Sequence, residues 1–425
     1  MKIYITLLWA LTLLASGCST VKQDESEAAV IISNDNATGP YLTHNRKGEV
    51  VLCWMAKESP DSVYRIKYAV FDSVSNQFGK TVTVNTSAGA SYSAESMAKV
   101  AFKNDGTAIA FFSKKFENER NPYAGGIFYS MSADEGKSWT NAQFLHSDTS
   151  HEYGRNFFDV AALKDGEIAA IWLDGRFGKA QKGSALFFAK TERGKGFGAD
   201  SCLSKGTCEC CRTDLLSDDT GNLHIAYRSI QFPSALMGAQ VRDMVYITSQ
   251  NNGKSFSGEK TISADNWKID GCPHSGPSLA MQGQTLNSVW FTAAAGNTGL
   301  YFAQQRAGSE FSKRNLISTG GRHPQLASIN GKLLLVFEEA VSSPTEHHNH
   351  SMQKGHQHQP AMAASIKLVK INGKELSPIA VTDGSAANHH AVITNINNKQ
   401  ALIAWIREEN NQSFICYSIK NVTDD

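Results

Sequence analysis

The segment Gly166-Glu-Ile-Ala-Ala-Ile-Trp172 is one of seven variants of a single pattern along this chain. In each variant a turn residue, usually glycine, is followed by alternating apolar positions and then by an aromatic residue. Period-two alternation rich in β-branched and aromatic residues predicts β-strands. The variants span residues 48–54, 106–112, 166–172, 221–227, 283–290, 331–337 and 399–405.

The segments around each variant also repeat. Another apolar strand precedes it, as at residues 324–329, and a loop, a third strand and a short fourth strand follow it. Four antiparallel strands recurring every ~40–60 residues are typical of a β-propeller. We therefore predict an all-β fold, a single β-propeller over residues 28–421, with seven four-stranded blades; six blades is the alternative.

The last repeat ends near Lys420 without a fourth strand, whereas an unpaired strand-like segment, Ala29–Ser33, precedes the first repeat. We expect this segment to pair beside Ser413–Ser418 and complete the last blade. Such closure removes exposed sheet edges.

The N-terminus predicts export. A positive start and an apolar run too short to span a membrane lead into Ala15-Ser16-Gly17-Cys18, which resembles a bacterial lipobox. We expect a signal peptide over residues 1–17, lipidation of Cys18 and a tether over residues 18–27. The residue after Cys18 is not aspartate, so the resemblance implies an outer membrane lipoprotein that faces the periplasm or the cell surface. The alternative is an ordinary signal peptide.

The charge balance argues against a nucleic-acid partner. The chain has 41 basic and 40 acidic residues, for a net charge of +1. Such a chain offers no general attraction to polyanions. The partners that we expect are the membrane, through the lipid anchor, and a metal ion or a small acidic glycan; protein partners are left open by the sequence.

A turn in the second repeat carries a family resemblance. Ser132-Ala-Asp134-Glu-Gly136-Lys-Ser-Trp139 resembles the Asp-box of the sialidase superfamily, and Ser249-Gln-Asn251-Asn-Gly253-Lys-Ser-Phe256 is a degenerate copy in the fourth repeat. The resemblance implies a sialidase-like propeller in which the boxes are structural turns. It does not by itself imply catalysis.

The resemblance also implies where a glycosidase site would lie. Catalytic sialidases use three arginines on the substrate carboxylate, a Tyr–Glu nucleophile pair and an aspartic acid/base. Arg155, Arg212 and Arg322 precede first strands, as such a triad would, and Asp174 could supply the acid. The early F/Y-R-I-P arginine motif is missing, so we expect sialidase ancestry without sialidase activity.

Cysteines and histidines gather where the first strands of later repeats begin. Propeller topology brings these ends together at one mouth of the central channel, so we expect one metal site there. Thiolate and imidazole ligands suit Cu(I) and zinc, and we favour copper over zinc. The expected ligands are Cys208, Cys210, Cys211, Cys272, His274, His323 and His389.

Disulfides are the alternative, because an exported protein favours them. Cys202 with Cys208, or a thiol of the 208–211 group with Cys272, are possible pairs, whereas Cys53 and Cys416 fall inside strands and are expected to be buried thiols.

A loop insertion in the sixth repeat, residues 342–363, supplies further donors on the same face. His-rich tracts are typical of metal binding, and methionine beside histidine favours copper. The accessory ligands that we expect are His347, His348, His350, Met352, His356 and His358. A solvated insertion without a ligand is the other interpretation.

Three functions therefore stay open. The first is a membrane-anchored propeller that binds a transition metal. The second is a glycan-active enzyme or glycan-binding lipoprotein, and the third is a platform for protein assembly. Whether the chain is an enzyme is not decided by the sequence; as one, it would be an exo-α-sialidase-like glycoside hydrolase or a metal or redox enzyme.

Overall fold

The protein is described by a computed structural model over residues 30–33, 36–57, 62–93, 95–180, 182–231, 239–271, 273–341, 363–371, 376 and 378–422. Regular structure in these residues consists of strands and two short 3₁₀ turns, η1 (Asn85–Ser87) and η2 (Gly178–Ala180). No helix in this part of the chain is long and apolar enough to span a membrane. The all-β prediction is confirmed.

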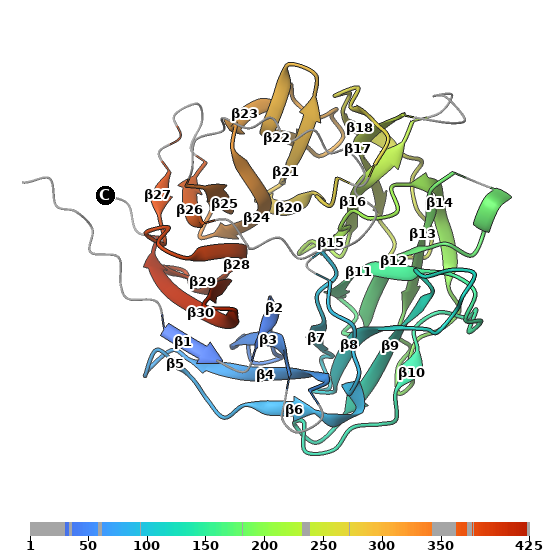
Figure 1. The fold of residues 1–425 in the computed structure, drawn as a ribbon, viewed down its shortest axis with the longest axis vertical. Helices are drawn as coiled ribbons and strands as arrows, with labels where there is room; N and C mark the ends of the chain where they lie inside the picture. The colour runs from blue at the N-terminus through green and yellow to red at the C-terminus, as the bar shows by residue number, and fades with distance from the viewer. Residues whose placement is uncertain are drawn as a thin grey trace, which may run out of the picture.

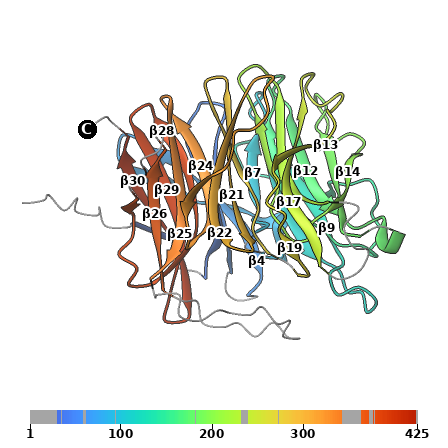
Figure 2. The ribbon, with the colours of Figure 1, turned by 90° about the horizontal axis from the view of Figure 1, so that it is seen from above.

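The strands form groups that follow one another around a ring, with one strand of each group nearest the centre (Figure 1). Seen from the side, the groups stand next to one another around the ring axis (Figure 2). Consecutive strands within a group pair antiparallel, which the alternating apolar pattern predicts.

Strands in the first half of the chain pair as follows. The first group contains β2 (Thr38–His44), β3 (Val50–Lys57), β4 (Tyr64–Asp72), β5 (Gln77–Phe78) and β6 (Val82–Val84). The second contains β7 (Lys99–Phe102), β8 (Ala108–Lys115), β9 (Gly125–Ser132) and β10 (Gln143–Phe144). The third contains β11 (Arg155–Ala162), β12 (Ile168–Asp174), β13 (Ser184–Lys190) and β14 (Ser201–Thr207).

The later strands continue the same order. β15 (Asp214–Ser217), β16 (Leu223–Ile230), β17 (Gln240–Ser249), β18 (Lys260–Ser263) and β19 (Lys268–Ile269) pair together. Next come β20 (Ser278–Gln282), β21 (Thr285–Ala294), β22 (Asn297–Arg306) and β23 (Asn315–Ser318). They are followed by β24 (Gly321–Ile329), β25 (Lys332–Ala340), β26 (Ala364–Lys370) and β27 (Ile379–Ala380), and then by β28 (Ala387–Asn397), β29 (Gln400–Glu409) and β30 (Gln412–Asn421).

Hydrogen bonding alone does not separate these groups completely. Thr207 pairs with Ser229, and Ala364 pairs with Ala387, so two bridges join neighbouring groups and the strands fall into five sheets. The blade count of seven therefore stays a prediction from the repeats.

The first strand closes the ring. β1 (Val30–Ser33) pairs antiparallel with β30, with Val30 opposite Tyr417 and Ile31 opposite Cys416. The predicted pairing of Ala29–Ser33 beside Ser413–Ser418 is thus confirmed over the described residues. Figure 1 shows the first and last strands of the chain side by side.

The core consists of separate apolar clusters between neighbouring groups. One cluster joins β8 and β9 to β11 and β12, and another joins β3 to β29 and β30 across the closure. The aromatic residue that ends each repeat is buried in these clusters, with at most 1% of its surface exposed: Trp54, Phe112, Trp172, Tyr227, Trp290, Phe337 and Trp405. Each burial contributes roughly 2–3 kcal/mol, which explains why the repeats require this position.

Candidate metal centre at the channel mouth

The innermost strands share an irregularity that shapes the channel mouth. β11, β24 and β28 each contain a bulge near their first residues, where the pairing register shifts. The residues Phe157, His323 and His390 have φ angles of 54°, 47° and 52° at these bulges. Non-glycine residues adopt positive φ only at a cost, and bulges re-aim side chains. The bulges therefore position two histidines that regular strands would direct elsewhere.

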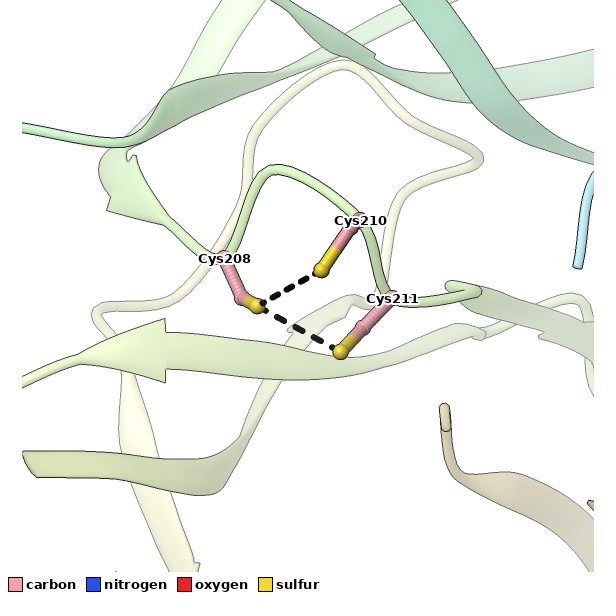
Figure 3. A group of neighbouring side chains, drawn as sticks. All are labelled: Cys208, Cys210 and Cys211. Carbon is pink, nitrogen blue, oxygen red and sulfur yellow. Dashed lines mark hydrogen bonds between the residues drawn. The ribbon is translucent and has the colours of Figure 1, made fainter. Parts of the chain in front are cut away.

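Three cysteines form one compact group in the loop between β14 and β15. The Sγ of Cys208 lies 3.8 Å from the Sγ of Cys210 and 3.3 Å from the Sγ of Cys211. All three are buried, with at most 5% of their surface exposed. Figure 3 shows the three sulfur atoms turned toward one another from a single tight loop.

The neighbours of Cys208 make its thiol more acidic. Hydrogen bonds from Cys210 and Cys211, and the nearby charge of Arg242, hold the pKa of Cys208 well below its ordinary value despite burial. Nη1 of Arg242 donates to the Cys208 Sγ at 3.1 Å and pairs with Glu209 at 2.9 Å. Burial raises the pKa of Cys211 well above its ordinary value. The shifts of the two pKa values are opposite, so Cys208 is the thiol of this pair that ionises more readily.

The other described cysteines lie outside this group, and one of them differs from what the sequence suggested. Cys53 and Cys416 are buried free thiols in strands, as predicted. The possible Cys202–Cys208 disulfide is wrong, because Cys202 is an exposed free thiol on β14 whose Sγ donates to Ser204 O at 3.6 Å. Cys272 lies outside the described residues.

Two histidines and a glutamate form a second group. Oε1 of Glu95, just before β7, lies 3.4 Å from Nε2 of His323 and 3.7 Å from Nε2 of His390. The ligand atoms of the three residues lie within 4.8 Å of one another, and the two imidazole rings stack with centroids 4.2 Å apart. Segments from three parts of the chain thus meet at one point.

Two neighbours hold these imidazoles in place. Glu338 pairs with Nδ1 of His323 at 2.7 Å and accepts the backbone N–H of His390 at 2.8 Å. Nδ1 of His389 lies 2.8 Å from Nδ1 of His390, so one of these nitrogens donates to the other. In both imidazoles of the second group the Nδ1 atom is occupied, and Nε2 is directed at Glu95.

The charged side chains of this second group change the pKa values of its two histidines. Burial alone would lower the pKa of His323, but the carboxylates of Glu338 and Glu95 outweigh it, and the pKa is raised. Burial, and then the charge of His323, hold the pKa of His390 well below its ordinary value. Of the two stacked imidazoles, His323 is therefore the one that binds a proton more readily.

The structure divides the predicted metal ligands. Cys208, Cys210 and Cys211 gather in the thiol group, whereas His323 belongs to the second group and His389 contacts it. Among the residues described, His274 joins neither group, and its side chain is exposed.

The predicted accessory ligands in the loop 342–363 lie outside the described residues. Glu95, His390 and Glu338 were missing from the predicted ligand set.

The arginines expected for a glycosidase have internal partners. Arg155 pairs with Asp148 at 2.7 Å and with Asp174 at 3.4 Å. Asp174 is fully buried and also pairs with Arg176 at 2.6 Å. Arg212 donates to the Pro324 carbonyl at 3.0 Å, and the Arg322 guanidinium stacks on Phe291. Each of the three guanidinium groups therefore contacts a group of the protein itself.

Both Asp-box segments form the expected structural turns. They follow the third strands β9 and β17. Asp134 accepts hydrogen bonds from Ser132 and from the backbone of Ser138, and Trp139 Nε1 donates to the Gly136 carbonyl. The degenerate copy repeats the geometry, with Asn251 accepting from the backbone of Ser255 at 2.9 Å.

Comparison with solved structures places the fold. The polysaccharide lyase Uly1 has a TM-score of 0.54 at 9% identity, covering 96% of this chain and 94% of that chain. The intramolecular trans-sialidase from Ruminococcus gnavus, in complex with oseltamivir carboxylate, has a TM-score of 0.50 at 8% identity, covering 92% and 96%. No protein-family model matches the sequence, and no curated protein sequence matches it.

Fold and Asp-box turns together define a class. The chain is a sialidase-like β-propeller, which confirms the resemblance predicted from the Asp-box segments. At identities this low the likeness concerns the fold alone.

Proposed function

We propose that this protein is a membrane-anchored propeller that binds a transition metal, with copper favoured, through Cys208, Cys210 and Cys211. The observation that carries the proposal is the cluster of three buried sulfur atoms, whose closest separations are 3.3 and 3.8 Å. A disulfide requires sulfur atoms ~2.05 Å apart. Metal–sulfur bonds of ~2.3 Å in a tetrahedral site separate sulfur ligands by ~3.8 Å, close to the spacing in this cluster.

The donor set favours a soft ion. Thiolates select Cu(I), zinc and iron–sulfur clusters over hard cations. Hydrogen bonds from Cys210 and Cys211, together with Arg242 at 3.1 Å, already favour the thiolate form of Cys208, so an arriving ion would displace protons from two thiols at most.

Sequence features outside the described residues extend this proposal. Cys272 would supply a fourth sulfur, and the histidines and methionines of residues 346–362 would collect metal at lower affinity. The lipobox at Cys18 would hold the propeller at the outer membrane. Replacing Cys18 with serine should release the protein from the membrane fraction or leave an uncleaved precursor, and unchanged fractionation would remove the anchor from the proposal.

The decisive measurement is the copper and zinc content of purified protein. We expect Cys210→Ser/Cys211→Ser to lose at least about tenfold in bound copper, because one sulfur cannot replace three. Deletion of residues 346–358 should lower the amount of weakly bound metal and leave the tightly bound metal unchanged. The matched control is Cys202→Ser, which removes an exposed thiol outside the cluster. Equal metal in the wild type and the double variant, or none in either, would end the proposal.

A further inference from the structure

The second group has the composition of an open metal site rather than of an ordinary ion pair. It offers two imidazole nitrogens and one carboxylate, which come from the segment before β7, from β24 and from β28. Two histidines and one carboxylate are a recurrent ligand set for zinc and for non-haem iron in proteins, and they leave coordination positions free.

Most of the atoms that would face an ion have no hydrogen-bond partner in the described part of the chain. Neither side-chain oxygen of Glu95 forms a hydrogen bond with any residue that the structure describes, although only 3% of this residue is exposed. Nε2 of His390 is buried and lacks a hydrogen bond to the described part of the chain as well. A buried carboxylate without hydrogen bonds costs several kcal/mol unless a charge compensates it. The nearby imidazole nitrogens at 3.4 and 3.7 Å are too distant for good hydrogen bonds.

The surroundings orient the ligands as metal sites do. Glu338 holds Nδ1 of His323, and His389 holds Nδ1 of His390, so the Nε2 atom of each ring remains directed at Glu95. Metal-ligating histidines usually have the other ring nitrogen fixed by a carboxylate or a similar partner. His389 itself is held from outside by Glu408, which lies 3.2 Å from its Nε2.

We propose that Glu95, His323 and His390 form a second metal site, separate from the thiol cluster, which takes a borderline divalent cation such as Zn²⁺ or Fe²⁺. Metal–ligand bonds of ~2.0–2.1 Å in a tetrahedral site separate the ligand atoms by ~3.3 Å. The measured separations from Glu95 Oε1, 3.4 and 3.7 Å, are close to this value. The inference does not depend on the thiol site, because it uses none of its residues.

Both histidines of the site are partly exposed to solvent. The side chains of His323 and His390 are 20% and 12% exposed, whereas Glu95 is almost fully covered. An ion bound there would have its three protein ligands on the inner side and a water molecule on the open side. Such a position suits a site that binds or activates a small ligand, since structural sites are normally closed by a fourth protein ligand.

Cobalt(II) separates the two sites by their spectra. Ligand-to-metal charge transfer in the near ultraviolet reports sulfur ligands, whereas nitrogen and oxygen ligands give only the visible d–d bands. The test uses the full mature chain with Cys208, Cys210 and Cys211 changed to serine and residues 346–358 deleted. We expect one equivalent of Co²⁺, with d–d bands and no sulfur band. Zn²⁺ should displace it.

Matched variants then assign the ligands. In this background Glu95→Gln and His323→Ala should each weaken Co²⁺ binding at least about tenfold. His151→Ala should not, because this exposed histidine stacks on Phe116 and belongs to neither ligand group. If circular dichroism shows that the background is unfolded, the same changes are made in the otherwise native chain, where the d–d intensity should fall while the sulfur band persists. Unchanged binding in Glu95→Gln, or no binding in a folded background, overturns the proposal whatever the sulfur band shows.

Discussion

At the scale of single residues, the channel concentrates charges that water cannot reach easily. A cavity of about 180 Å³ lies between the inner strands and is lined by Lys99, Asp159, Arg212 and Asp214, among others. Lys99 pairs loosely with Asp159, at 3.8 Å. Burial, and then the charge of Asp159, raise the pKa of Asp214 to about 7. The lining is therefore a polar network inside an otherwise apolar body, in which the protonation of one carboxyl matters.

The first prediction is that Asp214 makes stability depend on pH. The unfolded carboxyl loses its proton near pH 4, whereas in the folded protein the pKa of Asp214 is about 7. Between these values the folded state binds more protons, so stability falls as pH rises from about 4 to about 7 and then levels off. Asp214→Asn should remove this fall. The difference in unfolding free energy between variant and wild type should grow by roughly 1–3 kcal/mol from pH 4.5 to pH 8.

Urea unfolding at a series of pH values measures this difference. Asparagine can still accept the backbone N–H of Leu279, which Asp214 accepts at 2.9 Å, so the variant keeps that bond. The groups around the carboxyl are Asp159, Lys99 and Arg212 in the same lining. Asp219→Asn, in an exposed turn, is the control and should give parallel pH profiles. A profile for Asp214→Asn that also runs parallel to the wild type would contradict the prediction.

Residue chemistry explains which parts of the site the sequence could predict. Three cysteines within four positions, Cys208 to Cys211, must lie close together in any fold, so the thiol cluster was predictable. Glu95 was not, because it reaches histidines more than two hundred positions away along the chain. From the sequence alone, a glutamate just before a strand cannot be distinguished from a solvent-exposed glutamate. Only the folded ring brings Glu95 next to His323 and His390. His390 adjoins the predicted ligand His389, and only the bulge decides which of the two faces Glu95.

At the scale of elements, the closing strand decides whether the ring has an edge. β1 covers the outer edge of β30, and the backbone of Ala37 also donates to Ser413 O at 3.0 Å. Ile32 packs on the cluster shared by the first and last groups, whereas Ile31 is 50% exposed. An uncovered β30 would offer free backbone groups to another chain.

The second prediction concerns this strand. A chain that begins at residue 34 should be less stable than one that begins at residue 28, by roughly 2–4 kcal/mol, because it loses several backbone hydrogen bonds and the burial of Ile32. It should also self-associate, since β30 becomes an open edge. Thermal unfolding and light scattering measure the two effects. Ile31→Ser in the longer chain is the control and should change stability by less than about 0.5 kcal/mol; equal midpoints for the two chain lengths would show that β1 does not stabilise the ring.

Strand periodicity explains why the elements were predictable and the bulges were not. Alternating apolar residues identify a strand whatever its partner is, and the missing fourth strand of the last repeat indicated the role of β1. A bulge adds one residue without changing composition. The shifts at His323 and His390 therefore have no sequence signal beyond the histidines themselves.

At the scale of the whole molecule, the fold resembles that of glycan-processing enzymes, whereas the clustered side chains are those of metal sites. The ring resembles a trans-sialidase and a polysaccharide lyase in fold. Clusters of thiols and of histidines with glutamate lie just before or within the innermost strands instead. The apolar clusters between neighbouring strand groups stabilise the propeller. The loops that precede the innermost strands can therefore change without loss of the fold.

The last prediction follows from this divergence: the protein should not hydrolyse sialosides. Recognition of a sugar carboxylate needs guanidinium groups that are free to pair with it, but Arg155 is held by Asp148 and Asp174, and Arg212 donates to a backbone carbonyl. The acid candidate, Asp174, is fully buried in ion pairs. A fluorogenic sialoside, assayed beside an authentic sialidase, should show no release above the blank, and Arg212→Ala should match the wild type. Turnover that is abolished by Arg212→Ala would mean that these arginines exchange their internal partners for substrate, and the metal sites would then have to be reconsidered as accessory to a glycosidase.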